Sequence, residues 1–420
     1  MKLIDQPSAW DDPASDAIEE IVDHYNRGVP RADLASVRRL LARFAPARPL
    51  HHVVVVGTNG KTSTATLLAR LLAARGIAVG LYTSPHIARW SERVRIDGIS
   101  VSDDSLLATL TAIDRLAVQD RGVSPDLRFF DLLTLAAEDL FGRAGVEVAV
   151  FEAGIGGRLD ATRVLAPELV ALTSIGDDHR ELLGFTPQEI LSEKLAVAGK
   201  GSTLVIGHLD PGLAAQARAW AAEAGVELAE VGAPDPSPAE LPRFQRRNLA
   251  LARRTAELAD SLLGLSRAGE ITDFGVYGRF EQGQVDGVSY VADVAHNQTA
   301  WQELLLELER SSPERRWLAV VAVTAERRPE ELAAALAGAA TVAYVVATVT
   351  PVRAARDPSQ IVAALNSDRD GPAAEVCEPA ASAFDRGASL ARRYGLDLLV
   401  TGSNYLVSEF LAWLANRTER

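Results

Sequence analysis

Cysteine is almost missing from this sequence, because its 420 residues include a single one, Cys377. One cysteine excludes a framework of internal disulfides, and it excludes a metal site built from several thiolates. We therefore expect a protein that works in a reducing compartment, and we expect that compartment to be the cytoplasm.

Positive charge is the second shortage. The 43 lysine and arginine residues are outnumbered by 56 aspartate and glutamate residues, which gives a formal net charge of -13 and an isoelectric point near 5.1. Proteins that bind nucleic acids neutralise phosphates with a basic face. The acidic balance therefore argues against a nucleic-acid partner and favours chemistry on small molecules.

Long apolar runs are scarce as well. The opening stretch, "MKLIDQPSAWDDPASDAIEE", is acidic and has no apolar core, so we expect no secretory signal. The longest uncharged run, residues 332–352, reaches the length of a membrane span but contains Gly338 and Pro351. We interpret it as the end of a helix followed by a buried strand, and we expect no association with membranes.

Short apolar strands alternate with helices along the chain, which is 48% hydrophobic and 24% charged and long enough for two or three domains. Residues 53–56 form an apolar run of strand length, and residues 64–74 follow with leucines on one helical face. The alternation continues with strands at 79–82, 146–151, 169–174 and 203–206, and with helices at 131–143, 187–198 and 214–224. This order predicts an α/β fold in which helices cover both faces of a parallel sheet.

A second alternating series predicts a second domain. The proline-rich stretch Gly232–Phe244 reads as an exposed connection, and a helix at 246–263 closes the first series. The second series has strands at 289–292 and 317–323 and helices at 299–309 and 405–416. We place the boundary near residue 275, which gives domains 1–275 and 276–420.

The stretch "VVVVGTNGKTST", residues 53–64, is a candidate phosphate loop. The common G-x-x-x-x-G-K-[ST] pattern would need a glycine at position 55, where the chain has Val55. A shortened loop can still cradle phosphates, because it needs only glycines at a helix N-terminus, a lysine and a hydroxyl for Mg²⁺. The chain supplies these parts as Gly57, Gly60, Lys61 and Thr62 or Ser63. The alternative is an ordinary strand-to-helix turn with a solvated lysine.

Three further residues follow predicted strands or lie on a nearby helix. Glu152 ends an apolar strand and begins "EAGIGGRLDAT", so it lies at the sheet edge where α/β proteins bind ligands. His179 follows the next strand, and Lys194 lies on the helix that begins near Pro187. Each has a plain alternative: a solvated loop carboxylate, a surface or core histidine, and a solvated helix lysine.

Together these segments resemble the folylpolyglutamate synthase/dihydrofolate synthase family, a branch of the Mur ligase superfamily of ATP-dependent amide-forming enzymes. The matching segments run in family order from Gly57 to Glu409: "GTNGKTST", "YTSPHIARWSERVRIDG", "FEAGIGGRLDAT", "TSIGDDHRELLG", "EK", "FQRRNLALA", "GRFE", "ADVAHN" and "TGSNYLVSE". The resemblance implies the Mur ligase architecture: an N-terminal P-loop-type parallel-sheet ATPase domain and a smaller, Rossmann-like C-terminal α/β domain.

The resemblance also implies roles for individual residues. The ATP contacts would be Gly57, Thr58, Asn59, Gly60, Lys61, Thr62, Ser63, Asn248, Arg279, Asp293 and His296. Two Mg²⁺ ions would be held by Thr62, Ser84, Glu152, His179 and Lys194, the last as a carbamate. Lys61, His179 and Lys194 would serve catalysis directly. The acid substrate would be held by Pro85, His86, Arg93, Phe130, Asp131, Arg158 and Asp160.

The chemistry implied is the activation of a substrate carboxylate by ATP and its capture by an amine. The acid would be pteroate- or folate-like, the amine would be L-glutamate, and the protein would be a monomer. Phe129 and Phe130 could stack on a flat ring of the acid, although two aromatics at a helix start also suit a core.

Several positions depart from the family pattern and keep other functions open. The family has Asn where the chain has Arg163, an apolar residue where it has Asp177, His where it has Phe244, and Pro where it has Gln298. The segment "EKLAVAG" and the stretch "VTAERRPEEL" differ as well. One alternative is a paralogous ligase that joins another acid and amine. The other is a nucleotide-binding protein or NTPase that forms no amide.

Overall fold

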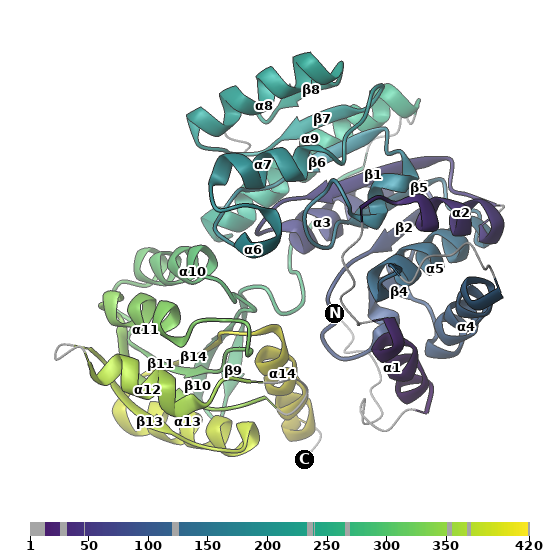
Figure 1. Cartoon of the computed structure of the whole chain (residues 1–420). Coiled ribbons are helices and arrows are strands. Elements are labelled where there is room, and N and C mark those ends of the chain that lie inside the picture. Colours follow the sequence, from purple (N-terminus) through teal and green to yellow (C-terminus); the bar gives the residue numbers. More distant parts are fainter. Residues whose placement is uncertain are drawn as a thin grey trace. The chain divides into compact units, whose positions relative to one another are not determined.

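The computed structural model describes residues 13–25, 32–45, 47–119, 126–232, 238, 240–264, 269–350, 355–367 and 371–418 (Figure 1). The chain divides into two compact units. The first unit comprises Met1–Pro238 and Gln245–Phe274, and the second comprises Ala239–Phe244 and Gly275–Arg420. Within the described part of the chain, no helix combines the length and the apolarity needed to cross a membrane.

The first unit is built on an eight-stranded sheet with the order β4-β3-β2-β5-β1-β6-β7-β8. Its strands are β1 (His51–Val56), β2 (Val79–Tyr82), β3 (Val94–Ile96), β4 (Ile99–Ser100), β5 (Val148–Glu152), β6 (Leu169–Leu172), β7 (Thr203–Ile206) and β8 (Glu227–Glu230). The strands from β2 to β8 in this order run parallel, as predicted. The sheet is nevertheless mixed, because β3 and β4 pair antiparallel at one edge.

Helices cover both faces of this sheet, because the β-branched strands alternate their side chains between two cores. Val54 and Val56 share one core with α2 (Ala35–Phe44), α5 (Phe129–Arg143), α7 (Pro187–Leu195) and α8 (Pro211–Ala224). Helix α3 (Lys61–Ala74) packs on β1, β2 and β5, and it is tied to α9 (Arg243–Leu263) by the Arg75 guanidinium, which donates to the Ala256 carbonyl at 2.9 Å. The remaining helices of this unit are α1 (Pro13–Tyr25), α4 (Asp103–Gln119), α6 (Arg180–Leu183) and the 3-10 turns η1 (Trp90–Arg93) and η2 (Ala161–Leu165).

The second unit has a six-stranded sheet with the order β13-β12-β11-β14-β10-β9. Its strands are β9 (Glu281–Val285), β10 (Val288–Ala292), β11 (Trp317–Val321), β12 (Val342–Ala347), β13 (Ala373–Val376) and β14 (Asp397–Thr401). Only β9 runs antiparallel, as the first strand of a hairpin with β10.

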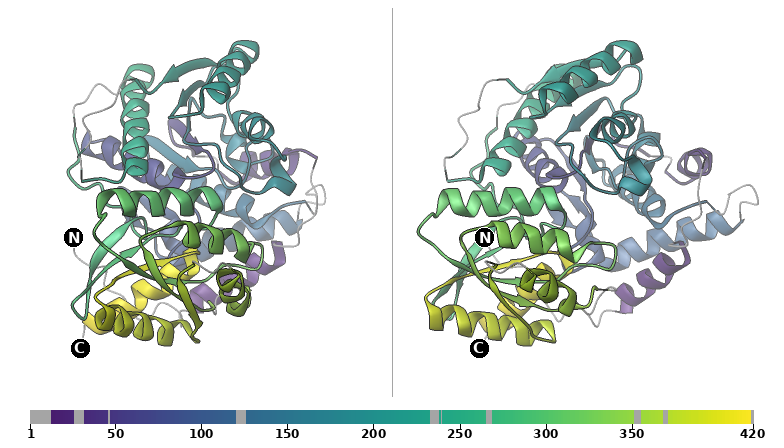
Figure 2. Two further views of the ribbon diagram at one scale, coloured as in Figure 1. Left: turned by 90° about the vertical axis from the view of Figure 1, so that its left-hand side faces the viewer. Right: turned by 60° about the vertical axis from the view of Figure 1, so that its left-hand side comes forward.

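Helices flank the second sheet on both sides (Figure 2). Ala319 and Val321 of β11 share a core with α10 (Gln298–Ser311), α11 (Pro329–Gly338) and α12 (Pro358–Asn366). The intervening Val320 faces α13 (Ala380–Tyr394), where a Cβ on Gly387 would lie 2.7 Å from the Val320 methyl. Helix α14 (Asn404–Thr418) packs beside α13 through the Phe384 and Phe410 rings, whose centroids are 5.3 Å apart.

The predicted strands and helices are present, with ends shifted by a few residues. The uncharged run at 332–352 divides into α11 and β12 as expected, while its last two residues lie outside the described residues. The predicted C-terminal end of the connection Gly232–Phe244 is wrong, because α9 already begins at Arg243. Sequence analysis assigned no element to β8, β9 or β13, since these edge strands carry little apolar patterning.

Candidate active site

The phosphate loop joins β1 to α3 and depends on two glycines. Gly57 and Gly60 have φ of 154° and 85°, a region that side-chain-bearing residues rarely adopt. A Cβ on Gly57 would collide with the Thr173 hydroxyl, and one on Gly60 would collide with the Asn248 carboxamide. The structure therefore places Asn248, from α9, directly against the loop.

Residues after β6 hold the loop in shape. The Thr58 and Asn59 amides donate to the Ser174 carbonyl at 2.8 Å and to the Ser174 hydroxyl at 3.1 Å. In return, the Thr173 hydroxyl donates to the Asn59 carbonyl at 2.7 Å. These bonds fix the backbone of the loop, and a loop that is already ordered lowers the entropic cost of binding a ligand.

Two lysines converge on one carbonyl of this loop. The Lys61 ammonium donates to the Gly57 and Thr58 carbonyls at 3.2 and 3.0 Å, and the Lys194 ammonium donates to the Gly57 carbonyl at 2.8 Å. Lys194 is 4% exposed. Burial, followed by the positive charge of Lys61, lowers the pKa of Lys194 from 10.5 to about 7. The loop thus gathers positive charge where an anion would relieve the repulsion.

A buried carboxylate lies next to the start of α3. Glu152 is the last residue of β5 and is 2% exposed. Its two oxygens accept bonds from the Thr62 hydroxyl at 3.1 Å and from the Ser84 amide at 3.0 Å. Three of the predicted metal ligands are therefore one hydrogen-bonded group, which contains hard oxygen donors of the kind that Mg²⁺ prefers.

His179 occupies a turn at the start of α6. Its φ of 51° is left-handed, its side chain is 37% exposed, and its Nε2 lies 3.7 Å from a carboxylate oxygen of Asp178. Among the described residues, no three His, Cys, Asp or Glu side chains gather as a metal-binding group. The predicted metal set contains only Glu152 and His179 of these types, so the rest of its ligands would be the hydroxyls of Thr62 and Ser84 and the carbamate oxygens of a modified Lys194.

The segment after β2 forms a stacked group of side chains. Pro85 follows Ser84 through a cis peptide bond. The Arg93 guanidinium donates to Nδ1 of His86 at 3.0 Å and lies 4.7 Å above the Trp90 ring, which contacts the His86 ring at 4.2 Å. Burial, followed by the Arg93 charge, lowers the pKa of His86 well below its ordinary value, so this ring is neutral. Sequence analysis missed Trp90, which lies inside the matched segment.

The predicted aromatic pair divides between two environments. Phe129 is 8% exposed and packs against Trp90, with ring centroids 5.2 Å apart, so it belongs to the core. Phe130 is partly buried and lies against the glycine stretch, where a Cβ on Gly154 would be 2.9 Å from its ring. Asp131 accepts a bond from the Arg128 amide at 2.7 Å and so fixes the start of α5.

Asp160 and Arg158 shape the glycine stretch after Glu152. The buried Asp160 carboxylate accepts bonds from the Gly154 amide at 2.9 Å and from the Thr162 hydroxyl at 2.6 Å. Burial raises the pKa of Asp160, and these bonds oppose the rise. Arg158 pairs with Glu193 at 3.1 Å.

In the second unit, the predicted ATP residues lie around the end of β10. Asp293 is buried and accepts bonds from the Phe280 and Ala295 amides, both at 2.8 Å. Burial raises the pKa of Asp293, while the nearby Arg279 charge opposes the rise. The Nδ1 of His296 donates to the Val294 carbonyl at 3.0 Å, which orients the imidazole ring at the end of β10.

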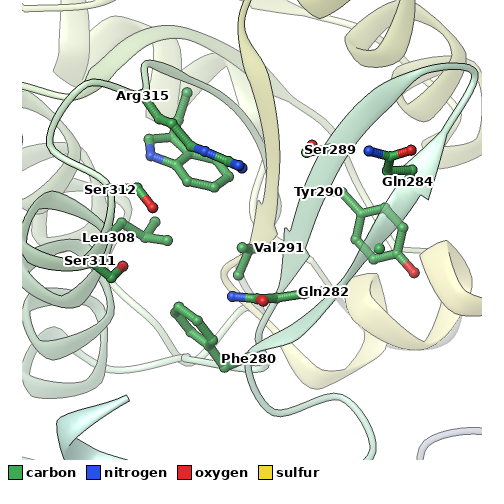
Figure 3. Close-up of a pocket in the computed structure, with 12 residues that line it drawn as sticks. Phe280, Gln282, Gln284, Ser289, Tyr290, Val291, Leu308, Ser311, Ser312 and Arg315 are labelled. Carbon is green, nitrogen blue, oxygen red and sulfur yellow. The ribbon is translucent and has the colours of Figure 1, made fainter. Parts of the chain in front are cut away.

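The second unit also has a pocket of about 370 Å³ between the β9–β10 hairpin and the end of α10 (Figure 3). Its lining is mostly polar and consists of Phe280, Gln282, Gly283, Gln284, Ser289, Tyr290, Val291, Leu308, Ser311, Ser312, Arg315 and Trp317. None of the predicted ATP residues lines it. Phe280 lines the pocket and also contacts a predicted ATP residue, because its backbone amide donates to the Asp293 carboxylate.

Comparison with known families identifies the class. Residues 55–254 match the Mur ligase middle domain, and residues 278–404 match the glutamate ligase domain of Mur ligases. The chain is 26% identical to a Mycobacterium tuberculosis folylpolyglutamate synthase solved with ADP, over 96% of this chain and 98% of that one, with a TM-score of 0.81. It is 25% identical to E. coli FolC solved with ADP, over 99% and 100% of the two chains, with a TM-score of 0.79.

Curated relatives narrow the class to a family. A probable bifunctional folylpolyglutamate synthase/dihydropteroate synthase of Haloferax volcanii is 31% identical over 407 residues, which are 89% of this chain and 47% of that protein. A dihydrofolate synthase/folylpolyglutamate synthase of Haemophilus influenzae is 39% identical over 176 residues, which are 42% and 39% of the two proteins. The matched segments thus span less than half the length of these relatives. The chain belongs to the folylpolyglutamate synthase/dihydrofolate synthase family of Mur ligases, which confirms the predicted family and fold.

Proposed function

We propose that this chain is an ATP-dependent ligase that adds L-glutamate to dihydropteroate, to folates, or to both. The observation that carries the proposal is the pair of lysine ammonium groups that meet at the Gly57 carbonyl of a braced glycine loop. Such a site suits a polyphosphate. The names of the relatives and the ADP complexes of the structural neighbours support the same conclusion.

In the proposed reaction, an oxygen of the acid's carboxylate attacks the γ-phosphorus of ATP, which gives an acyl phosphate and ADP. The glutamate amine then attacks the acyl carbon, phosphate leaves, and the amine's proton is lost. Lys61 would exchange the neutral carbonyls of Gly57 and Thr58 for charged phosphate oxygens, which are stronger acceptors. The fixed loop would hold the phosphates in line with the attacking oxygen.

The oxygen donors around Glu152 fit magnesium, since the buried carboxylate accepts a bond from the Thr62 hydroxyl and another from the backbone amide of Ser84, a residue that also carries a hydroxyl. Thr62, Ser84, Glu152, His179 and a carbamylated Lys194 would hold the metal in two sites. Bound there, Mg²⁺ would neutralise charge on the transferring phosphoryl group. From the second unit, Arg279, Asp293 and His296 would bind the nucleotide. We further propose that the protein acts as a monomer in the cytoplasm.

Phosphate release tests the proposed function. Purified protein is incubated with ATP, Mg²⁺ and either dihydropteroate or tetrahydrofolate, with and without L-glutamate. Released phosphate is measured, and the masses of the products are determined by mass spectrometry. We expect turnover that depends on glutamate and a product heavier by one glutamyl group. ATP hydrolysis that needs neither acid nor amine would point to an NTPase. The absence of turnover by an intact, ATP-binding protein would point to a ligase for another acid.

Replacing Asn248 with alanine is expected to weaken ATP binding about 10-fold, because the carboxamide that lies against Gly60 is lost and a hydrogen bond to a charged group is worth about 1.5–3 kcal/mol. Turnover at saturating ATP should change little. Calorimetric titration with a non-hydrolysable ATP analogue measures the affinity. The matched control is Asn366→Ala, at the exposed end of α12. Equal affinity in the Asn248→Ala variant and the wild type would remove Asn248 from the nucleotide site.

A further inference from the structure

Three arginines of the first unit meet beside the glycine stretch, and we call them the arginine cluster: Arg38, Arg158 and Arg163. Arg38 lies on α2, which contacts the η2 turn that carries Arg163. Arg158 lies in the loop between β5 and η2. The Arg163 guanidinium donates to the Arg158 carbonyl at 3.1 Å, so the backbone of one member is bound by the side chain of another.

The cluster has more positive charge than its partners neutralise. Glu193 is ion-paired with Arg158, at 3.1 Å. The Arg38 guanidinium forms no hydrogen bond or ion pair with any residue that the structure describes. Burial, followed by the charges of Arg38 and Arg158, lowers the pKa of Arg163, and Glu193 opposes this shift only in part. Uncompensated cations are therefore gathered at one place in a chain whose net charge is -13.

This cluster is attached to the phosphate loop through the backbone. The Arg158 amide donates to the Glu193 carbonyl at 3.1 Å, and a Cβ on Gly157 would lie 2.6 Å from the Lys194 carbonyl. The Lys194 side chain in turn binds the Gly57 carbonyl at 2.8 Å. The backbone beside Arg158 therefore contacts the end of α7, whose Lys194 binds the phosphate loop.

We propose that the arginine cluster binds a second carboxylate of the acid substrate, distinct from the carboxylate that ATP activates. The inference rests on the proposed function and assigns a preference to it: acids with two carboxylates bind better than acids with one. Guanidinium groups suit this role, because their planar N–H donors match the two oxygens of a carboxylate. Such an anion would also offset the repulsion that Arg38 and Arg158 exert on Arg163.

The test compares two acids that differ in one charge. Tetrahydrofolate carries α- and γ-carboxylates on its glutamyl group, and its α-carboxamide lacks the second negative charge while keeping the reacting γ-carboxylate. We expect the wild type to show a KM for tetrahydrofolate about 10-fold or more below that for the α-carboxamide, with similar kcat. Arg163→Gln and Arg38→Gln should remove most of this difference by raising the KM for tetrahydrofolate alone. Arg163→Lys should retain part of it.

Controls separate recognition from folding. Arg115→Gln, on the exposed face of α4, removes the same charge elsewhere in the first unit and should leave both KM values unchanged. Because Arg163 also binds the Arg158 carbonyl, Arg38→Gln is the cleaner variant. If both acids lose affinity equally in Arg38→Gln and Arg163→Gln, or neither does, the proposal is overturned.

Measurements on the wild type alone distinguish failure of the second-carboxylate site from failure of the proposed ligase function. Equal KM values for the two acids, or turnover of dihydropteroate without turnover of tetrahydrofolate, would contradict the second-carboxylate site and leave the ligase function standing. No glutamate-dependent turnover with any of these acids would contradict the proposed function, and the inference would fall with it.

Discussion

Replacing Lys61 with alanine is expected to lower glutamate-dependent turnover about 10³-fold, which is the usual cost of removing one charge-stabilising donor from a preorganised site. The ammonium is held at the phosphate loop by the Gly57 and Thr58 carbonyls, so it needs only a short movement to reach phosphate oxygens. Phosphate release at saturating ATP, acid and glutamate measures the loss.

The fold of this variant should be intact, because Lys194 continues to bind the Gly57 carbonyl. Circular dichroism and the midpoint of thermal unfolding check this. Lys200→Ala, at an exposed turn, serves as the matched control and should keep full turnover. Turnover by Lys61→Ala within about 10-fold of the wild type would remove Lys61 from the phosphoryl-transfer step.

Local sequence patterns predicted the parts of the site that local structure determines. The short apolar run before Gly57 indicated a strand, and the glycines and leucines after it indicated a turn and a helix. Glu152 was predictable for the same reason, since it ends a strand of five buried residues. Parallel strands bring their carboxyl ends to one edge, which is why segments far apart in the chain supply one site.

Contacts between distant segments could not be predicted from such patterns. Nothing around Lys194 indicates that its ammonium binds Gly57, 137 residues earlier. Trp90 was missed because a tryptophan among charged residues has no periodic pattern. The strands β3 and β4 were missed because they are three and two residues long.

Two departures from the family pattern have local explanations. Asp177 replaces an apolar residue, and it forms an ion pair with Arg180 at the start of α6. Phe244 stands where histidine is common, and its ring packs edge-on against Phe280 with centroids 5.9 Å apart. Arg163 is different, because its side chain adds charge to a cluster beside the site.

Lys194→Met is expected to raise stability while lowering turnover about 100-fold or more. The pKa of Lys194 falls from 10.5 in the unfolded chain to about 7 in the folded one. Below pH 7 both states are protonated, and the folded state bears the full cost of burying the charge. Between pH 7 and about 10.5 the unfolded state binds more protons, so the free energy of unfolding rises with pH. Methionine removes both the cost of burying the charge and the pH dependence that Lys194 contributes. The free energy of unfolding should therefore rise by a few kcal/mol near pH 6.

Thermal unfolding between pH 6 and 9 in buffer free of carbon dioxide measures this difference. The wild type should gain more stability over this range than Lys194→Met, because all other titrating groups are shared. A neutral amine at pH 7 can also add carbon dioxide and release a proton, which gives a carbamate whose negative charge Lys61 would neutralise. Bicarbonate should therefore stabilise the wild type and leave the variant unchanged. Parallel pH profiles in the two proteins would show that Lys194 keeps an ordinary pKa, and an equal response to bicarbonate would argue against the carbamate.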